Sequence, residues 1–135
     1  MLRPDDYNKS QLVLAGWRHG KVFGGHLGSC LIMSVLANRQ RVGWGSWSEI
    51  IHNIPKYSAT IEQPNDIPQI WAPDFTRLLH EVEAIYAGSM DYAKGGMYWL
   101  DSAKPVDNLW FKEKILSNLD IHAKCCDMNS LIVLR

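Results

Sequence analysis

The chain has 135 residues and a mass of 15.4 kDa, which is enough for one domain whose core needs no disulfide or metal. Its composition, 47% apolar and 21% charged, excludes a disordered chain, and 14 basic residues balance 14 acidic ones, which excludes a dedicated nucleic-acid-binding protein. Because the charges balance, we expect no nucleic acid as partner. No apolar run could span a bilayer and the N-terminus carries no apolar signal segment, so we expect no membrane as partner either.

The first residues predict an arm followed by a helix. Residues 1–10 are polar and we assign them to a loose N-terminal arm, with one domain over residues 11–135. Ser10 is the candidate cap of a first helix that ends near Arg18. The glycines of Gly20–Gly28 then predict a tight loop, because glycine weakens a helix interior.

The strongest helical pattern of the chain follows this loop. Its apolar positions recur at helical spacing, and the segment Asn38–Arg41 gives it a polar end. Because the pattern is apolar on more than one face, it predicts a buried central helix. Ser46 or Ser48 is then expected to cap a short helix through Ile51. The apolar positions of the central helix are Leu27, Leu31, Ile32, Val35 and Leu36.

The second half of the chain begins with an irregular stretch and ends with apolar segments. Residues 53–70 are rich in proline and polar residues and predict a long loop. Pro73 opens a second clear helix that Gly88 ends. Met97–Leu100 and Leu131–Leu134 predict short strands, with a short helix between them around Trp110 to Leu116. The fold class is therefore α+β, mainly α, with a small antiparallel element.

Aromatic residues and cysteines leave several interpretations open. Six tryptophans could line a groove for sugar rings or fill the core; Trp71 and Trp110 are expected in the core, whereas Trp44 and Trp47 stay undecided. The odd set Cys30, Cys125 and Cys126 predicts reduced thiols rather than a disulfide framework.

Neither the histidines nor the glycine-rich segment indicates a binding site for a metal or a cofactor. The five histidines form no metal-binding motif, and scattered surface or core positions explain them; they are His19, His26, His52, His80 and His122. The glycine segment matches no nucleotide-binding loop, and no nucleophile elbow supports a Ser-His-Asp triad. We therefore expect neither a metal nor a cofactor.

Several short motifs occur in an order found in one group of cell wall hydrolases. Trp17–Lys21 leads through Gly28 into Val35–Arg39, followed by Glu49–Ile51 and Lys56–Ser58. In spore-cortex-lytic (SleB-like) hydrolases, a Trp/Tyr-Arg-Glu-Ala-Arg-Gly-Glu segment leads through a glycine into a helix ending in Asn-Arg. A short Asp-Val-Val helix and a Gln-Phe-Ser turn come next. The chain resembles this family, including its small phage-encoded forms.

The resemblance continues to the C-terminus and covers residues from about 11 onward. The family has an Ala-Gly helix end, an Asp, a Gly-Gly-Ala-x-x-Tyr strand, a Trp-Phe pair, a His and a final apolar strand. The similar segments here are Ala87-Gly88, Asp91, Gly95–Trp99, Trp110-Phe111, His122 and Leu131–Leu134.

The resemblance implies a lysozyme-like fold that cleaves the glycan strands of peptidoglycan, commonly as a lytic transglycosylase. Such cleavage needs a carboxylic acid with a raised pKa. The position of the family's catalytic Glu holds His19, or Gly20 in an ungapped alignment, and no Glu precedes Glu49. His19 and Glu49 are the candidate replacements. The residues implied to bind substrate are Trp17, Tyr57, Ser58, Tyr98 and Trp99.

These observations predict a peptidoglycan-directed domain of a phage virion in which catalysis is lost or altered. It would be made in the host cytoplasm without a signal peptide, and its partners would be glycan strands and other virion proteins. Two alternatives stay open. One is a structural tail or assembly protein that reuses the hydrolase fold, and the other is an active hydrolase with an unfamiliar acid.

Overall fold

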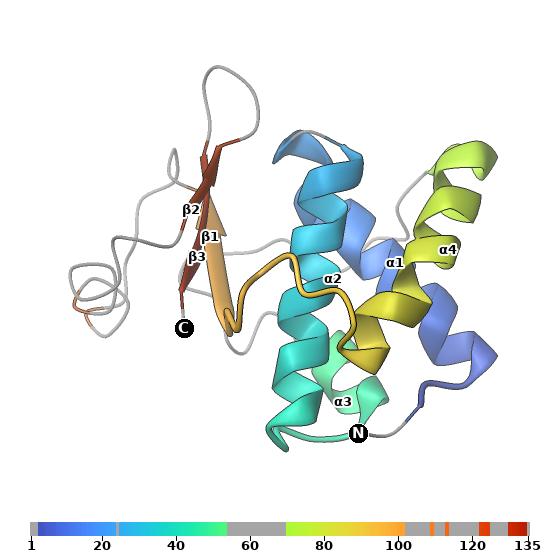
Figure 1. The fold of residues 1–135 in the computed structure, drawn as a ribbon, viewed down its shortest axis with the longest axis horizontal. Coiled ribbons are helices and arrows are strands. Elements are labelled where there is room, and N and C mark those ends of the chain that lie inside the picture. Colours follow the sequence, from blue (N-terminus) through green and yellow to red (C-terminus); the bar gives the residue numbers. More distant parts are fainter. Residues whose placement is uncertain are drawn as a thin grey trace.

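The computed structural model describes residues 3–23, 25–53, 70–101, 109, 113, 122–124 and 130–134. Within these residues a helical bundle lies beside a small antiparallel sheet (Figure 1). The helices are α1 (Asp6–Gly20), the 3-10 turn η1 (Lys21–Phe23), α2 (His26–Arg41), α3 (Trp47–His52) and α4 (Ala72–Ala87). The strands are β1 (Tyr98–Asp101), β2 (His122–Lys124) and β3 (Ser130–Leu134). The α+β, mainly α class is thus confirmed.

Helix α1 begins earlier than its sequence pattern suggested. Asp5 is the N-cap, and its carboxylate accepts a hydrogen bond of 2.7 Å from the backbone N–H of Asn8. Asp6 adds a second acidic group in the first turn, where the helix dipole favours negative charge. The predicted start at Ser10 is therefore wrong, and residues 6–10 belong to the helix rather than to an arm.

Helix α2 is the buried centre of the bundle, as its apolar pattern predicted. Every residue from Gly28 to Gln40 is buried, and α1, α3, α4 and β1 all pack against it. Even its polar end is enclosed, since Asn38 and Arg39 are 4% and 2% exposed. A helix that is covered all round has to place its polar side chains where neighbouring segments can hydrogen-bond them.

The glycines between α1 and α2 serve close packing as well as a turn. Gly20 is the last residue of α1, Lys21–Phe23 form η1, and α2 already begins at His26. The prediction of one loop over Gly20–Gly28 is therefore wrong at both ends. A Cβ atom on either glycine would overlap the backbone of the other. Gly16 is similar, because its Cβ would lie 2.9 Å from the carbonyl oxygen of Ser29. The absence of side chains at these positions lets the two helices cross nearly in contact.

The two other helices begin and end close to their predicted residues. Ser46 caps α3, and Gly88 ends α4 in the left-handed region at φ 83°. Trp47 is 3% exposed and belongs to the core. Trp71, which was expected in the core, is 70% exposed because it stands at the N-cap of α4, before the apolar face begins.

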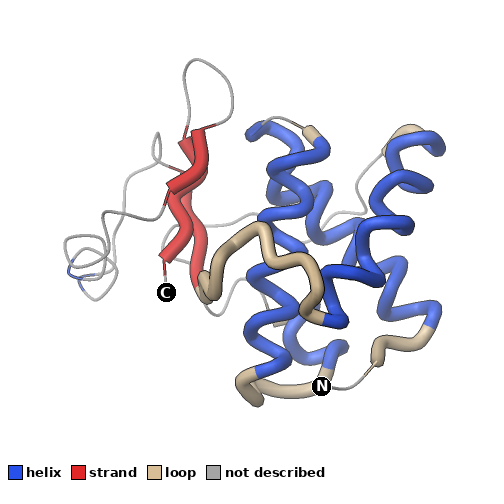
Figure 2. The backbone as a smooth tube through the Cα atoms, viewed as in Figure 1, coloured by secondary structure: helices blue, strands red, loops and turns tan. Residues whose placement is uncertain are grey.

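A short connection brings the chain from α4 across α2 to the sheet (Figure 2). Asp91 accepts hydrogen bonds from the backbone N–H groups of Ala93 and Gly95 at 2.9 and 2.8 Å. The amide of Asn38 donates to both oxygens of Asp91 at 3.3 and 3.2 Å and to the Gly96 carbonyl at 3.1 Å. This carboxylate therefore fixes the turn to the central helix.

The sheet has the order β1-β3-β2, and both pairings are antiparallel. Tyr98 lies opposite Leu134 in register, and Val133 and Leu134 are buried. The predicted strands at residues 97–100 and 131–134 are thus confirmed. Strand β2 was not predicted, since its three residues carry no recognisable alternation.

Several sequence predictions concern residues outside the described part of the chain. These include most of the loop 53–70, Cys125 and Cys126, and the short helix around Trp110, of which only Leu109 and Glu113 are described. Among the described helices, none has the length and apolar character required to cross a membrane.

The crossing of α1 and α2 predicts a strong dependence on Gly28. Gly28→Ala should lower the free energy of unfolding by about 3 kcal/mol or more, because its methyl group meets backbone rather than a side chain that could move. Chemical denaturation followed by circular dichroism measures this change.

Gly43→Ala is the control for that substitution. Gly43 has φ 92° but nothing within 4 Å of an added Cβ, so only backbone strain of about 1 kcal/mol is expected. Equal losses in the two variants would show that space between the helices is not limiting.

Candidate functional sites

An aromatic–arginine cluster joins the bundle to the sheet. It is formed by His19, Arg39, Trp44, Tyr98 and Trp99. The Cζ atom of Arg39 lies 4.8 Å from the ring centroid of Trp99, 5.0 Å from that of Trp44 and 5.8 Å from that of Tyr98. A guanidinium in contact with ring faces is attracted by their quadrupoles, most strongly where water is excluded.

Three parts of the fold supply these side chains. Arg39 comes from the end of α2, and its Nε donates a 2.8 Å hydrogen bond to the carbonyl of Met97, just before β1. Trp44 follows α2 and lies 5.5 Å from Tyr98 between ring centroids. His19, at the end of α1, lies 5.6 Å from Trp99. The cluster therefore depends on α1, α2 and β1 together.

The rings of this cluster are fixed yet partly accessible. His19, Trp44, Tyr98 and Trp99 are all half-buried, whereas Arg39 beneath them is 2% exposed. Aromatic rings held in this way present apolar surface to solvent at little further entropic cost. The arrangement suits a ligand with flat apolar faces and a polar rim.

The structure brings together some of the residues predicted to form a site and separates others. His19, Tyr98 and Trp99 share the cluster, which also contains Arg39 and Trp44. Trp17 is partly buried and packs against the hydrophobic core. Tyr57 and Ser58 lie outside the described residues.

Glu49, a candidate acid, has a structural role at the start of α3. The hydroxyl of Ser46 accepts a 3.2 Å hydrogen bond from the Glu49 N–H and donates one of 3.1 Å to its carboxylate. This is a capping arrangement with the expected Ser-x-x-Glu spacing. Glu49 is exposed, and a solvated capping carboxylate lacks the apolar surroundings of a general acid.

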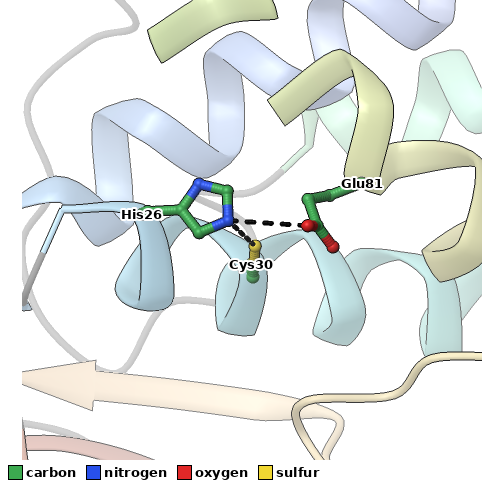
Figure 3. Close-up of side chains that lie close together, drawn as sticks. All are labelled: His26, Cys30 and Glu81. Carbon is green, nitrogen blue, oxygen red and sulfur yellow. Dashed lines mark hydrogen bonds and ion pairs between the residues drawn. The ribbon is translucent and has the colours of Figure 1, made fainter. Parts of the chain in front are cut away.

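A second cluster, the His–Cys–Glu cluster, connects α2 to α4 (Figure 3). It consists of His26, Cys30 and Glu81, whose ligand atoms all lie within 4.8 Å of one another. The Nε2 atom of His26 is 3.7 Å from Cys30 Sγ and 3.8 Å from Glu81 Oε1. Cys30 is fully buried, while the side chains of His26 and Glu81 are 30% and 34% exposed.

Tyr92 completes the surroundings of this cluster. Its hydroxyl donates a 3.2 Å hydrogen bond to Glu81 Oε2, and its backbone N–H donates to the Ser34 hydroxyl at 3.1 Å. Burial raises the pKa of Tyr92 to about 12, with the neighbouring Cys30 and Glu81 adding to it. Burial also raises the pKa of the Cys30 thiol to about 12, and the negative charge of Glu81 acts in the same direction.

The geometry of the second cluster argues against a cysteine nucleophile. In a catalytic triad the thiol and the orienting carboxylate use different ring nitrogens. Here both approach the same atom, His26 Nε2, as Figure 3 shows. A nucleophilic cysteine also needs a lowered pKa, whereas the pKa of Cys30 is raised.

The sequence pattern missed this cluster for a specific reason. His26 and Cys30 are four residues apart and so share a helix face, which was a visible signal. A glutamate beside the apolar positions of an amphipathic helix is ordinarily a solvated charge, and no local pattern shows that Glu81 on α4 meets α2. Glu83 does fit that interpretation: it is exposed, and Lys9 lies 3.0 Å away. His26, in contrast, is not an isolated histidine.

Comparisons with protein-family models, with curated proteins and with solved structures find no match to this chain. The two clusters are therefore interpreted from their own geometry.

The aromatic–arginine cluster predicts that lysine cannot replace Arg39. Arg39→Lys keeps the charge but loses the planar group that contacts three rings and the Nε donor to Met97. We expect a loss of about 2–4 kcal/mol in the free energy of unfolding, measured by urea denaturation. Arg77→Lys on exposed α4 surface is the control, and an equally small effect of both would contradict this role of Arg39.

The burial of Cys30 predicts a thiol that resists alkylation. In a Cys125→Ser/Cys126→Ser background, iodoacetamide at pH 8 should label the unfolded chain quickly and the folded chain at least about 100-fold more slowly. The thiol is 0% exposed and its pKa is raised to about 12, so little thiolate is accessible. Mass spectrometry of timed samples measures the rate, and rapid labelling of the folded chain would contradict the buried position.

Proposed function

We propose that the chain is a peptidoglycan-directed domain of lysozyme-like type, carried in a phage virion, which binds glycan strands and in which cleavage of those strands is lost or altered. The observation that carries this proposal is the aromatic–arginine cluster, which gathers Trp44, Tyr98 and Trp99 around one buried guanidinium. The resemblance of the motif order to spore-cortex-lytic hydrolases supplies the substrate class.

The chemistry of a glycan strand matches such a cluster. Each pyranose ring has an apolar face formed by C–H groups and a rim of hydroxyls. Half-buried indole and phenol rings can stack on the apolar faces, while polar groups at their edges take hydrogen bonds from the rim. The segments Trp17–Lys21 and Gly95–Trp99, which carry much of the resemblance, both contribute to the cluster or flank it.

The contacts of three described glutamates support lost or altered rather than ordinary catalysis. Glu49 is bound to Ser46, Glu81 contacts His26 and Tyr92, and Glu83 pairs with Lys9. In the aromatic–arginine cluster, His19 is one of the two residues, with Gly20, that the resemblance aligns with the family's acid. A protonated imidazole can donate a proton, but its positive charge opposes the developing oxocarbenium ion.

Glycan binding predicts selective effects of tryptophan substitution. Trp44→Ala should weaken binding to purified sacculi about two- to tenfold, since an aromatic contact contributes about 0.5–1.5 kcal/mol. Trp71→Ala is the matched control, because Trp71 is 70% exposed at the start of α4 and outside the cluster. Pull-down and tryptophan fluorescence measure the affinity, with circular dichroism to verify folding.

Mass spectrometry of the material released from sacculi then separates the alternatives. The parent should release nothing and His19→Glu should release muropeptides, if the site has lost only its acid. Anhydro-muropeptides from the parent would identify an active transglycosylase. No binding and no release by either protein would overturn the proposal and favour a structural virion component.

A further inference from the structure

We propose that His26, Cys30 and Glu81 form a binding site for one divalent transition-metal ion of the zinc type. This site is separate from the aromatic–arginine cluster and independent of the proposed function. It joins two helices that are far apart in the chain, since Glu81 on α4 follows Cys30 on α2 by 51 residues. Figure 3 shows the three side chains converging between α2 and α4.

The distances between the three ligand atoms are close to those of a tetrahedral site. With metal bonds of about 2.3 Å to sulfur and about 2.0 Å to nitrogen and oxygen, tetrahedral angles place ligand atoms about 3.3–3.6 Å apart. The observed separations are 3.7 Å from Cys30 Sγ to His26 Nε2 and 3.8 Å from His26 Nε2 to Glu81 Oε1. All three atoms lie within 4.8 Å of one another, so small side-chain rotations suffice.

The types of ligand select the metal. One sulfur, one imidazole nitrogen and one carboxylate oxygen suit Zn²⁺ and similar ions, whereas Ca²⁺ and Mg²⁺ prefer oxygen ligands alone. A thiolate and a carboxylate also balance the two positive charges of the ion, which limits the cost of burying it. The proton displaced from the Cys30 thiol leaves to solvent.

The surroundings favour a stable but open site. The hydroxyl of Tyr92 holds Glu81 Oε2 at 3.2 Å, and such outer hydrogen bonds orient metal-binding carboxylates. Cys30 closes the inner side, while His26 and Glu81 are partly exposed. Solvent can therefore reach the fourth coordination position, as in zinc sites that activate a water molecule.

The test is titration of the purified full chain with Co²⁺, followed by competition with Zn²⁺. The expected result is one ion per chain in native mass spectrometry, with the near-ultraviolet charge-transfer absorption of a cobalt–thiolate bond. Glu81→Gln and His26→Gln should each weaken binding at least about 100-fold, and Tyr92→Phe about tenfold. Cys30→Ser should abolish the thiolate absorption.

Matched substitutions on the same chain serve as controls. Glu83→Gln and His80→Gln change exposed residues on either side of Glu81 and should leave the affinity unchanged. The Cys125→Ser/Cys126→Ser variant should also bind normally, which separates Cys30 from the adjacent thiols. Because Glu81 and His26 are partly exposed, their variants should fold even if Cys30→Ser does not.

Three results would overturn the proposal. The first is the absence of stoichiometric Co²⁺ or Zn²⁺ binding by the parent chain. The second is binding that survives both Glu81→Gln and His26→Gln. The third is binding that disappears in the Cys125→Ser/Cys126→Ser variant but remains in folded Cys30→Ser. None of these results bears on glycan binding, so the two proposals fail separately.

Discussion

The enclosure of α2 from Gly28 to Gln40 is the constraint on which the rest of the structure depends. A helix buried on all sides can be approached closely only where neighbours lack side chains, and Gly16 and Gly20 of α1 meet that requirement. Its polar groups must find partners inside the protein, so Asn38 and Arg39 determine where the segments before β1 run. Both candidate sites arise from this helix, one on its face toward α4 and the other at its end beside β1.

The two clusters represent different uses of a buried polar group. Arg39 is covered by rings and a carbonyl, which spreads its charge over π-systems and leaves apolar surface facing solvent. Cys30 is covered by α4, and its histidine and carboxylate neighbours remain partly hydrated. The ligands proposed for them differ accordingly, a neutral sugar ring for the first cluster and a metal cation for the second. The two clusters share α2 but lie apart on it, with Cys30 near its start and Arg39 near its end.

The sequence predicted helices and strands well where residues close together in the chain determine them. The caps at Ser46 and Gly88, the apolar pattern of α2 and the two longer strands depend on neighbouring residues alone. The start of α1 was misplaced because Asp5 is as good a cap as Ser10. The folded structure decides between them, since Asp5 accepts a hydrogen bond from Asn8 and Lys9 contacts Glu83 of α4.

The sites were less accessible to such reasoning because their members come from distant segments. Tyr98 and Trp99 were named from motif order, but Arg39 and Trp44 join them only through the connection that follows α4. Glu49 was selected as the first glutamate of the chain, and its role at the cap of α3 needed the three-dimensional arrangement. Helix pairing likewise decides that Glu81, and not Glu83, faces α2.

The turn around Asp91 has a consequence for the order in which the molecule opens. Its carboxylate binds two backbone N–H groups of its own turn and the Asn38 amide of the central helix. Gly96, at the end of that turn, is so close to Val133 that no side chain fits there. Helix, turn and strand therefore meet at one point. We therefore expect the amide protons of Ala93 and Gly95 to exchange by global unfolding of the bundle rather than by fraying of the sheet.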